Sequence, residues 1–135
     1  MLVVDSSIVL SWLLSDEAAR ITDALAEDVH RSGAVAPALL RLEVANVLVV
    51  SERRGRISSA TMIASLSDFE EMAIQLEPGL DAAATRAVLQ LARAEGLTVY
   101  DASYLELALR LGAELFTLDK ELVAAARRHG VPVRP

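Results

Sequence analysis

The sequence contains no cysteine and only two histidines among its 135 residues. Without cysteine, a disulfide framework and a thiolate metal site are both excluded. His30 and His129 lie far apart in the chain and lack the spacing of paired metal ligands. The sequence therefore argues against a disulfide-stabilised domain and against a zinc site of the usual nitrogen and sulfur kind.

Aromatic residues are also scarce, at 4%, although 53% of the chain is hydrophobic. The core must then be built mainly from Leu, Val, Ile and Ala. A chain of this length suits one domain, and we see no repeat or linker, so we predict a single domain over residues 1–135. No apolar run approaches the roughly 18 residues of a membrane span, and the first residues do not resemble a signal peptide. We expect a cytoplasmic protein that makes no membrane contact.

Acidic residues outnumber basic ones by 19 to 13, for a formal net charge of −6. This balance argues against a simple basic protein that coats nucleic acid. It leaves open an enzyme whose own acids hold cations, because a bound metal ion reverses the local field.

Short apolar runs alternate with helical patterns along the whole chain. Gly33, Gly96 and Gly112 each follow a helical pattern, as helix-ending glycines do. Strands separated by helices predict an α/β fold, a three-layer α/β/α sandwich around a mainly parallel sheet. The predicted strands are residues 2–4, 34–36, 73–77, 114–118 and 131–134, and the predicted helices are residues 6–14, 16–31, 38–54, 58–72, 81–95, 100–111 and 120–129.

Two of the predicted strands end in an acid. Asp5 follows the first strand, and Asp119 follows the strand at residues 114–118. Open parallel sheets bind ligands beyond the carboxyl ends of their strands, where the strand order reverses, so these acids are expected to face one crevice. The alternative is that both are helix N-caps, which Asp commonly is, and that they carry no chemistry.

Glu43 lies on a helix that is otherwise largely apolar. Its neighbours three and four residues away are Leu39, Leu40, Asn46 and Val47, so no salt bridge is available within the helix. An acid on such a face is expected to be hydrogen-bonded, bound to metal, or paired with an arginine from elsewhere.

Asp101 follows Thr98 by three residues, which matches a capping box at the start of a helix. The same placement directs its carboxylate to the mouth of a helix N-terminus, beside the expected crevice. Capping alone also explains the pair.

Four carboxylates that converge without counter-charge repel one another and raise one another's pKa. Mg²⁺ and Mn²⁺ favour carboxylate and water oxygens and would relieve this repulsion. Such an ion lowers the pKa of a bound water and offsets charge on a phosphoryl oxygen. The hydroxyls of Ser7 and Thr117, two residues from Asp5 and Asp119, can orient metal waters or contact phosphate. They can equally be ordinary strand-end and cap residues.

Four segments carry these acids in order from Asp5 to Asp119, over nearly the whole chain. They are residues 3–7, followed by Trp12, and residues 42–48, 100–105 and 116–119. Together they resemble the four acidic motifs of PIN domains, and most closely those of the VapC-type toxins of bacterial toxin–antitoxin pairs.

The resemblance implies Mg²⁺- or Mn²⁺-dependent cleavage of RNA by a homodimer that a cognate VapB-type antitoxin inhibits. Our hypothesis is that Asp5, Asp101 and Asp119 hold the metal, while Glu43 completes the shell or acts as general base. By resemblance, Ser7 and Thr117 occupy the supporting hydroxyl positions, and Asn46 matches a residue often found after the second acid.

Arginines give an acidic protein two places to attract RNA. Arg53, Arg54 and Arg56 form the only dense basic run, and Arg127 with Arg128 forms a smaller pair. Arginine suits phosphate, so these are candidate RNA contacts. The alternative is an ordinary solvated helix end, where cations also favour the helix dipole.

Three aromatic residues, Tyr100, Tyr104 and Trp12, can stack on RNA bases, although helical spacing favours a core position for Trp12. The helix around Glu43 is apolar on nearly every side, which predicts burial in the core or cover by a partner. One side carries Leu39, Leu42, Asn46 and Val49, and another carries Leu40, Val44, Val47 and Leu48.

Two alternative functions remain open. The first is phosphoryl transfer on an aspartyl group, as in receiver or haloacid-dehalogenase-like domains, although Ser6 and Ser7 stand where a second acid would follow Asp5. The second is a catalytically silent PIN-like binding module. An Asp5→Asn variant distinguishes the latter, because only a nuclease would lose metal-dependent cleavage.

Overall fold

The computed structural model describes residues 1–14 and 19–134 and has a five-stranded sheet between helices. The strands are β1 (Leu2–Val4), β2 (Ala34–Pro37), β3 (Ile74–Glu77), β4 (Glu114–Phe116) and β5 (Val133–Arg134). The helices are α1 (Ser6–Leu14), α2 (Ala19–Ser32), α3 (Leu39–Arg53), α4 (Ser59–Glu71), α5 (Ala82–Glu95), α6 (Val99–Leu111) and α7 (Lys120–Arg128).

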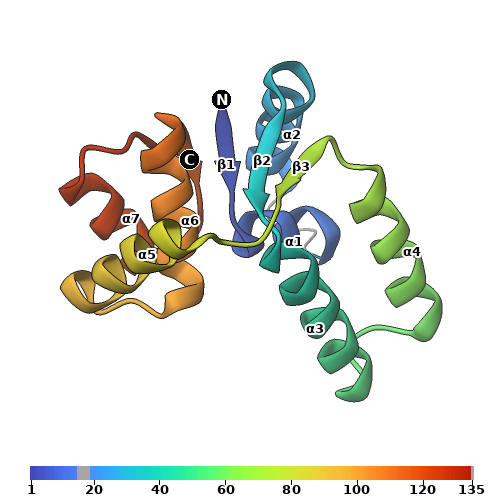
Figure 1. Cartoon of the computed structure of the whole chain (residues 1–135). Coiled ribbons are helices and arrows are strands. Elements are labelled where there is room, and N and C mark those ends of the chain that lie inside the picture. The colour runs from blue at the N-terminus through green and yellow to red at the C-terminus, as the bar shows by residue number, and fades with distance from the viewer. Residues whose placement is uncertain (15–18, 135) are drawn as a thin grey trace.

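All strand pairs of the sheet are parallel, in the order β3-β2-β1-β4-β5. Figure 1 shows α5, α6 and α7 on one side of the strands and α1 to α4 on the other. Helix α6 packs against β1, β2 and β4, while α7 packs against β5. The predicted three-layer α/β/α sandwich is confirmed.

Strand β1 is central because it is apolar throughout. Leu2, Val3 and Val4 are all buried, as expected for a parallel strand that is covered on both faces. From β1 the chain proceeds to β2 and β3, and then returns to the other side of β1 as β4. The strand order therefore reverses between β1 and β4, and ligands of open α/β sheets bind at such a point.

Strand β4 ends at Phe116, two residues earlier than predicted. The Thr117 N–H still donates to the Arg134 carbonyl at 3.0 Å, but the Leu118 N–H donates to Ser7 Oγ at 2.9 Å. The strand ends here because a side chain from α1 takes the place of the next backbone partner.

Strand β5 begins at Val133, two residues later than predicted. Pro132 has no N–H to donate, and the Val131 N–H donates to the Ala126 carbonyl at the end of α7, at 2.9 Å. The start of the helix predicted at residues 16–31 lies outside the described residues. The other predicted boundaries agree with the structure within one residue.

The helix caps agree with the sequence signals. Thr98 Oγ1 accepts a hydrogen bond from the Asp101 N–H at 3.0 Å, which confirms the predicted cap of α6. Gly112 ends the same helix in the left-handed conformation, with φ 62°, where glycine is favoured. In the described part of the chain, no helix is both long enough and apolar enough to cross a membrane.

Candidate active site

Asp5 lies at the centre of a buried hydrogen-bond network at the end of β1. It is 4% exposed, and its Oδ1 accepts hydrogen bonds from Ser7 Oγ at 2.6 Å and from the Ile8 N–H at 3.1 Å. Its Oδ2 accepts a hydrogen bond from the Thr117 hydroxyl. The bond from Ile8 caps α1, so Asp5 is a helix cap and also lies at the switch point. Oδ2 accepts one hydrogen bond and retains the capacity for a further ligand.

Ser7 and Thr117 join the ends of β1 and β4. Their hydroxyl oxygens are 3.4 Å apart, and both donate to Asp5. Thr117 Oγ1 also accepts a hydrogen bond from the Asp119 N–H at 3.0 Å. The two hydroxyls thus connect the Asp5 carboxylate, at the end of β1, to the backbone of Asp119, which follows β4.

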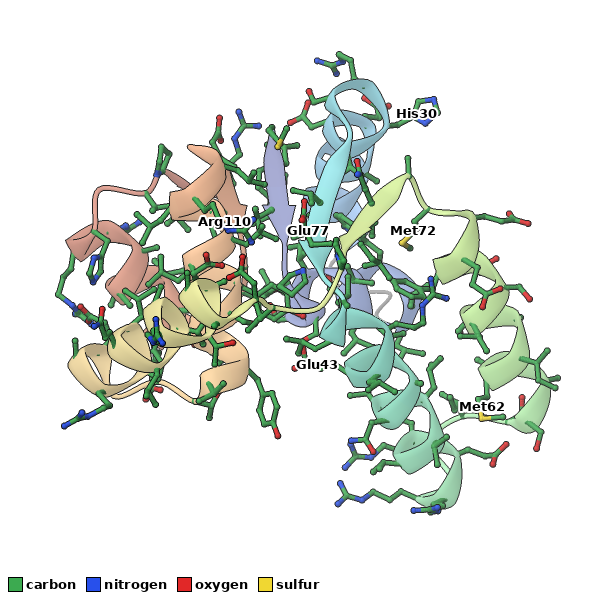
Figure 2. The ribbon with its side chains drawn as sticks, in the orientation of Figure 1. His30, Glu43, Met62, Met72, Glu77 and Arg110 are labelled. Atoms are coloured by element: carbon green, nitrogen blue, oxygen red, sulfur yellow. The ribbon has the colours of Figure 1, made fainter. Side chains whose placement is uncertain are left out.

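Glu43 lies at the sheet end of α3 (Figure 2) and accepts a hydrogen bond from the Tyr104 hydroxyl on α6. Tyr104 is 1% exposed, so it does not stack on an RNA base, contrary to our expectation. Within the described residues, no arginine, lysine or histidine forms an ion pair with Glu43. The hydrogen-bond partner that we expected for Glu43 on this apolar helix face is therefore a neutral hydroxyl, that of Tyr104.

Asp101 and Asp119 lie at the starts of two neighbouring helices, α6 and α7. Asp119 Oδ1 accepts a hydrogen bond from the Leu122 N–H at 3.0 Å, which confirms the N-cap interpretation. Burial raises the pKa of the Asp101 carboxyl, and the charge of Asp119 raises it further. Asp119 is therefore the N-cap of α7 and also lies close enough to Asp101 to act on it electrostatically.

The pKa shifts show that Asp101 interacts electrostatically with each of the other three acids. Burial raises the pKa of Asp5, against the hydrogen bonds of Ser7 and Thr117, and the charge of Asp101 adds to the rise. Burial likewise raises the pKa of Glu43, and Asp101 and Asp5 add to that rise. Mutual repulsion of this kind favours either protons or a cation between the carboxylates.

The four acids are not arranged as a complete set of metal ligands. The described residues contain no group of three or more acidic, histidine or cysteine side chains arranged to hold a metal ion. The chemistry of the donor set nevertheless fits a hard divalent cation, since every donor is a carboxylate or hydroxyl oxygen. None of the four acids has a cationic partner among the described residues.

Sequence analysis missed Glu121, which lies in the first turn of α7 and also raises the pKa of Asp101. Its position two residues after a strand-end acid was the available signal. The role of Tyr104 toward Glu43 was missed as well, although a buried tyrosine generally finds a partner for its hydroxyl.

The structure leaves the other predicted residues outside this network. Asn46 is exposed on α3, and no hydrogen bond joins its side chain to the described part of the site. Arg53, Arg54 and Arg56 are exposed at the far end of α3, where Arg53 lies about 15 Å along the helix axis from Glu43 at the usual rise per residue.

Of the smaller basic pair, Arg127 is exposed, while Arg128 forms an ion pair with Glu95 at 2.5 Å. His129 also contacts Glu95, at 2.9 Å. The charge of Arg128 is therefore largely neutralised within the chain.

The chain as a whole is similar to known proteins. The family model "PIN domain" matches residues 2–128. Ribonuclease VapC3 from Pyrobaculum aerophilum is 31% identical over 124 residues, which cover 90% of this chain and 91% of that protein.

Two solved structures are similar over most of their length. PAE2754 from Pyrobaculum aerophilum superimposes with a TM-score of 0.73 at 25% identity, over 98% of this chain and 87% of that one. VapC20 from Mycobacterium tuberculosis, described as a toxin that cleaves the sarcin–ricin loop, has a TM-score of 0.63 at 14% identity, over 93% and 95% of the two chains. The latter likeness concerns the fold alone. The match to the family model and the identity to VapC3 together show that this chain belongs to the PIN-domain family.

Proposed function

We propose that this protein is a divalent-metal-dependent endoribonuclease and the toxin of a VapBC-type toxin–antitoxin pair. The observation that carries the proposal is the electrostatic interaction of Asp101 with Asp5, Glu43 and Asp119, none of which has a cationic partner among the described residues. Membership of the PIN family and the likeness to Ribonuclease VapC3 support RNA as the substrate.

Asp5, Asp101 and Asp119 would hold the cation, Mg²⁺ or Mn²⁺. When bound, such an ion lowers the pKa of a bound water and offsets charge on the scissile phosphate. Mg²⁺ usually keeps several waters and takes only one or two protein carboxylates directly, which suits acids that converge loosely. Ser7 and Thr117 hold the Asp5 carboxylate in place with two hydrogen bonds, so that it need not reorganise when substrate binds.

Glu43 is the acid best placed to hold or accept a proton. Its raised pKa brings it closer to the working pH, where a general base is most effective. The hydrogen bond from Tyr104 orients the carboxylate. Glu43 therefore either completes the ligand shell or takes the proton of the attacking water.

The strand order argues against the receiver alternative. Receiver domains have the order 2-1-3-4-5, whereas this sheet has the order β3-β2-β1-β4-β5. A catalytically silent binding module has the same fold as a nuclease, and the sequence retains all four acids. Only a measurement of RNA cleavage distinguishes the two functions.

We further propose that the exposed side of α3 contacts a second copy of the chain. Leu40, Val44 and Leu48 face the core, while Leu42 is 75% exposed and Val49 is also exposed. Two large apolar side chains that are exposed on one side of a helix suit contact with another protein surface. Dimerisation there would place the two Glu43 side chains on neighbouring helices. A VapB-type antitoxin is the second expected partner.

The test is incubation with total RNA and a tRNA panel in the presence of Mg²⁺, Mn²⁺ or EDTA. We expect cleavage with either metal, none with EDTA, and at least a 100-fold loss in Asp5→Asn, as is usual when one electrostatic contact to a transition state is removed. Asp68→Asn removes the same charge at an exposed position on α4 and should retain full activity. Absence of cleavage under every metal by antitoxin-free protein would leave the binding module as the better interpretation.

A further inference from the structure

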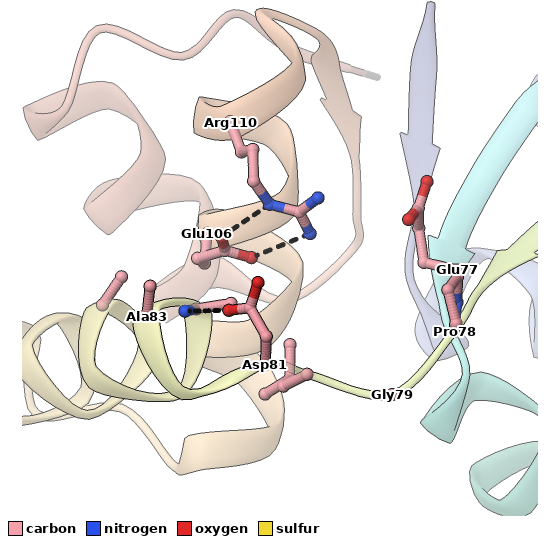
Figure 3. A pocket seen from close by; sticks show the side chains of 10 residues that line it. Glu77, Pro78, Gly79, Asp81, Ala83, Glu106 and Arg110 are labelled. Atoms are coloured by element: carbon pink, nitrogen blue, oxygen red, sulfur yellow. Dashed lines mark hydrogen bonds and ion pairs between the residues drawn. The ribbon is translucent and has the colours of Figure 1, made fainter.

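A cleft runs between the segment at residues 77–81 and helix α6. Two adjoining cavities, of about 410 and 260 Å³, form it. Sites that hold small organic ligands have volumes of about 300–1,000 Å³, so the larger cavity lies within this range and the smaller just below it. Figure 3 shows the larger cavity. The residues common to both are Glu77, Pro78, Gly79, Leu80, Glu106 and Arg110.

None of the four acids lines the smaller cavity, but neighbours of two of them do. Leu39 lies one helical turn before Glu43 on α3, and Tyr100 directly precedes Asp101 on α6; both line the cavity. Four residues span about 6 Å along a helix. Tyr100 is 64% exposed, and its ring offers a surface on which a base can stack. A group in this cleft would therefore lie close to the acids.

Donor and acceptor groups face each other across the polar end of the cleft. Arg110 is held by the buried Glu106, with Nε–Oε1 at 2.8 Å and Nη2–Oε2 at 3.4 Å. This contact uses one edge of the guanidinium, and the other edge points toward Glu77 on β3 (Figure 3). Within the described residues Glu77 forms no ion pair.

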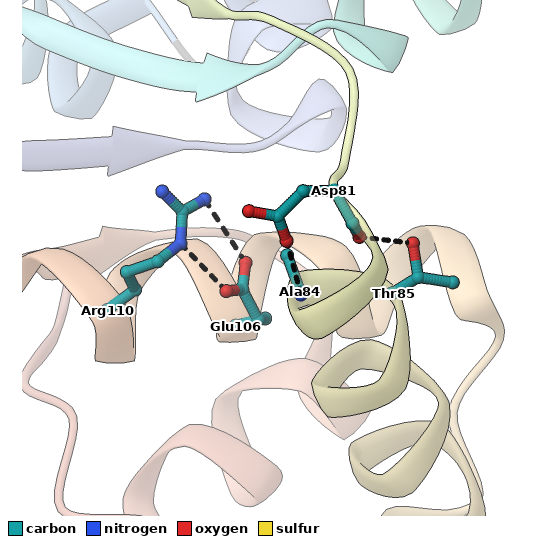
Figure 4. Close-up of polar contacts among 5 residues, drawn as sticks. All are labelled: Asp81, Ala84, Thr85, Glu106 and Arg110. Carbon is teal, nitrogen blue, oxygen red and sulfur yellow. Dashed lines mark hydrogen bonds and ion pairs between the residues drawn. The ribbon is translucent and has the colours of Figure 1, made fainter.

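Asp81 has only one carboxylate oxygen available for a ligand. Figure 4 shows its carboxylate at the start of α5, where Oδ1 accepts a hydrogen bond from the Ala84 N–H at 2.8 Å. Its carbonyl oxygen accepts a hydrogen bond from Thr85 Oγ1, also at 2.8 Å. Among the described residues of the cleft, Glu77 is the carboxylate whose two oxygens both remain available, and Arg110 offers one guanidinium edge.

We propose that this cleft binds a guanine base of the RNA, next to the bond that is cleaved. The proposal rests on the proposed ribonuclease function and adds a base preference to it. Guanine presents two acceptors, N7 and O6, which suit an arginine fork, and two parallel donors, N1–H and the 2-amino group, which suit a carboxylate. Adenine, cytosine and uracil each lack at least one of these paired edges.

The test is calorimetric titration of the full chain, in EDTA, with guanosine monophosphate and with inosine monophosphate, which lacks only the 2-amino group. We expect guanosine monophosphate to bind about 5- to 150-fold more tightly, as for one well-formed bidentate contact. Glu77→Gln should abolish this difference. Glu71→Gln removes the same charge from an exposed position at the end of α4 and should retain it. Circular dichroism melts verify that both variants are folded.

Equal affinity for the two nucleotides, or a preference that survives Glu77→Gln, would overturn the guanine site. RNA cleavage without any guanine preference would do the same and leave the ribonuclease proposal intact, whereas guanine binding without cleavage would support the site and oppose the nuclease. The Tyr100→Ala variant tests whether a second copy of the chain covers the cleft. If it converts a dimer to a monomer without weakening nucleotide binding, the cleft belongs to a protein interface and the proposal fails.

Discussion

Replacing Thr117 by valine tests the network that holds Asp5. The two side chains have nearly the same shape, and Thr117 is 1% exposed, so the change removes hydrogen bonds and little else. Two bonds are lost, the one donated to Asp5 Oδ2 and the one accepted from the Asp119 N–H at 3.0 Å.

The first bond involves a charged acceptor, which is typically worth about 1.5–3 kcal/mol, and the second is worth about 0.5–1.5 kcal/mol. We expect Thr117→Val to lower the free energy of unfolding by about 2–4 kcal/mol, a large part of the roughly 5–15 kcal/mol typical of a domain. For a chain of this size, that corresponds to a fall in Tm of about 6–20 °C.

The loss should depend on pH in a defined direction. Without Thr117 the pKa of Asp5 rises further, because one of the hydrogen bonds that lower it is gone. A carboxyl whose pKa is higher in the folded state than in the unfolded state favours folding at low pH, and this advantage disappears as the pH rises through the folded-state pKa. Thr117→Val should therefore be less destabilised near pH 4 than at pH 7.

Urea denaturation of the metal-free protein measures these values. Thr85→Val is the matched control, since its hydroxyl donates to the Asp81 carbonyl at an exposed helix start, and its effect should stay within about 0.5 kcal/mol. In a double-mutant cycle with Asp5→Asn, we expect a coupling of about 0.5–3 kcal/mol. A loss no larger than that of the control, or additive effects in the cycle, would refute the role given to Thr117.

Three further predictions follow from the same site. First, burial and mutual repulsion raise the pKa values of Asp5, Glu43 and Asp101, so the folded metal-free protein binds extra protons. Its free energy of unfolding, measured by urea denaturation, should therefore fall as the pH rises above about 4. Saturating Mn²⁺ should remove this fall, and an unchanged dependence of the unfolding free energy on pH would count against metal binding. Second, Asp119→Asn should keep the stability that the N-cap provides, while Asp119→Ala should lose about 1 kcal/mol of unfolding free energy. Both variants should lose RNA cleavage to the same extent. An active Asp119→Asn variant would show that Asp119 is only a cap. Third, Tyr104→Phe should lower the free energy of unfolding by about 1.5–3 kcal/mol and raise the pKa of Glu43. The acid limb of the pH–rate profile should then move to higher pH. A limb that does not move would exclude Glu43 as the group that titrates.

Local signals were sufficient to predict most of the fold. The run Leu2–Val4 followed by Asp5 identified a buried strand that ends at the switch point, and Thr98 with Asp101 identified the start of α6. Each of these features is decided by residues within one turn or one strand. Asp5, Asp101 and Asp119 could be named for the same reason, because each belongs to a strand end or a helix start. Glu43 could be named because it is an isolated acid on a largely apolar helix.

Contacts between distant segments could not be predicted. The hydrogen bond from Tyr104 to Glu43 joins residues 61 positions apart, and the one from Leu118 to Ser7 joins residues 111 apart and shortens β4. Both depend on which strands become neighbours, and no local pattern encodes that order. The same limit applies to Glu121, which acts on Asp101 only because α6 and α7 pack together.

The most direct test of a shared metal site is titration of Mn²⁺ into the metal-free protein, followed by electron paramagnetic resonance of the free ion. We predict saturable binding that both Asp5→Asn and Asp101→Asn abolish, although these acids come from β1 and α6, and that the exposed-site variant Asp68→Asn leaves unchanged. Binding that survives both site variants, or no saturable binding to the wild-type chain, would contradict a common ion between the four carboxylates.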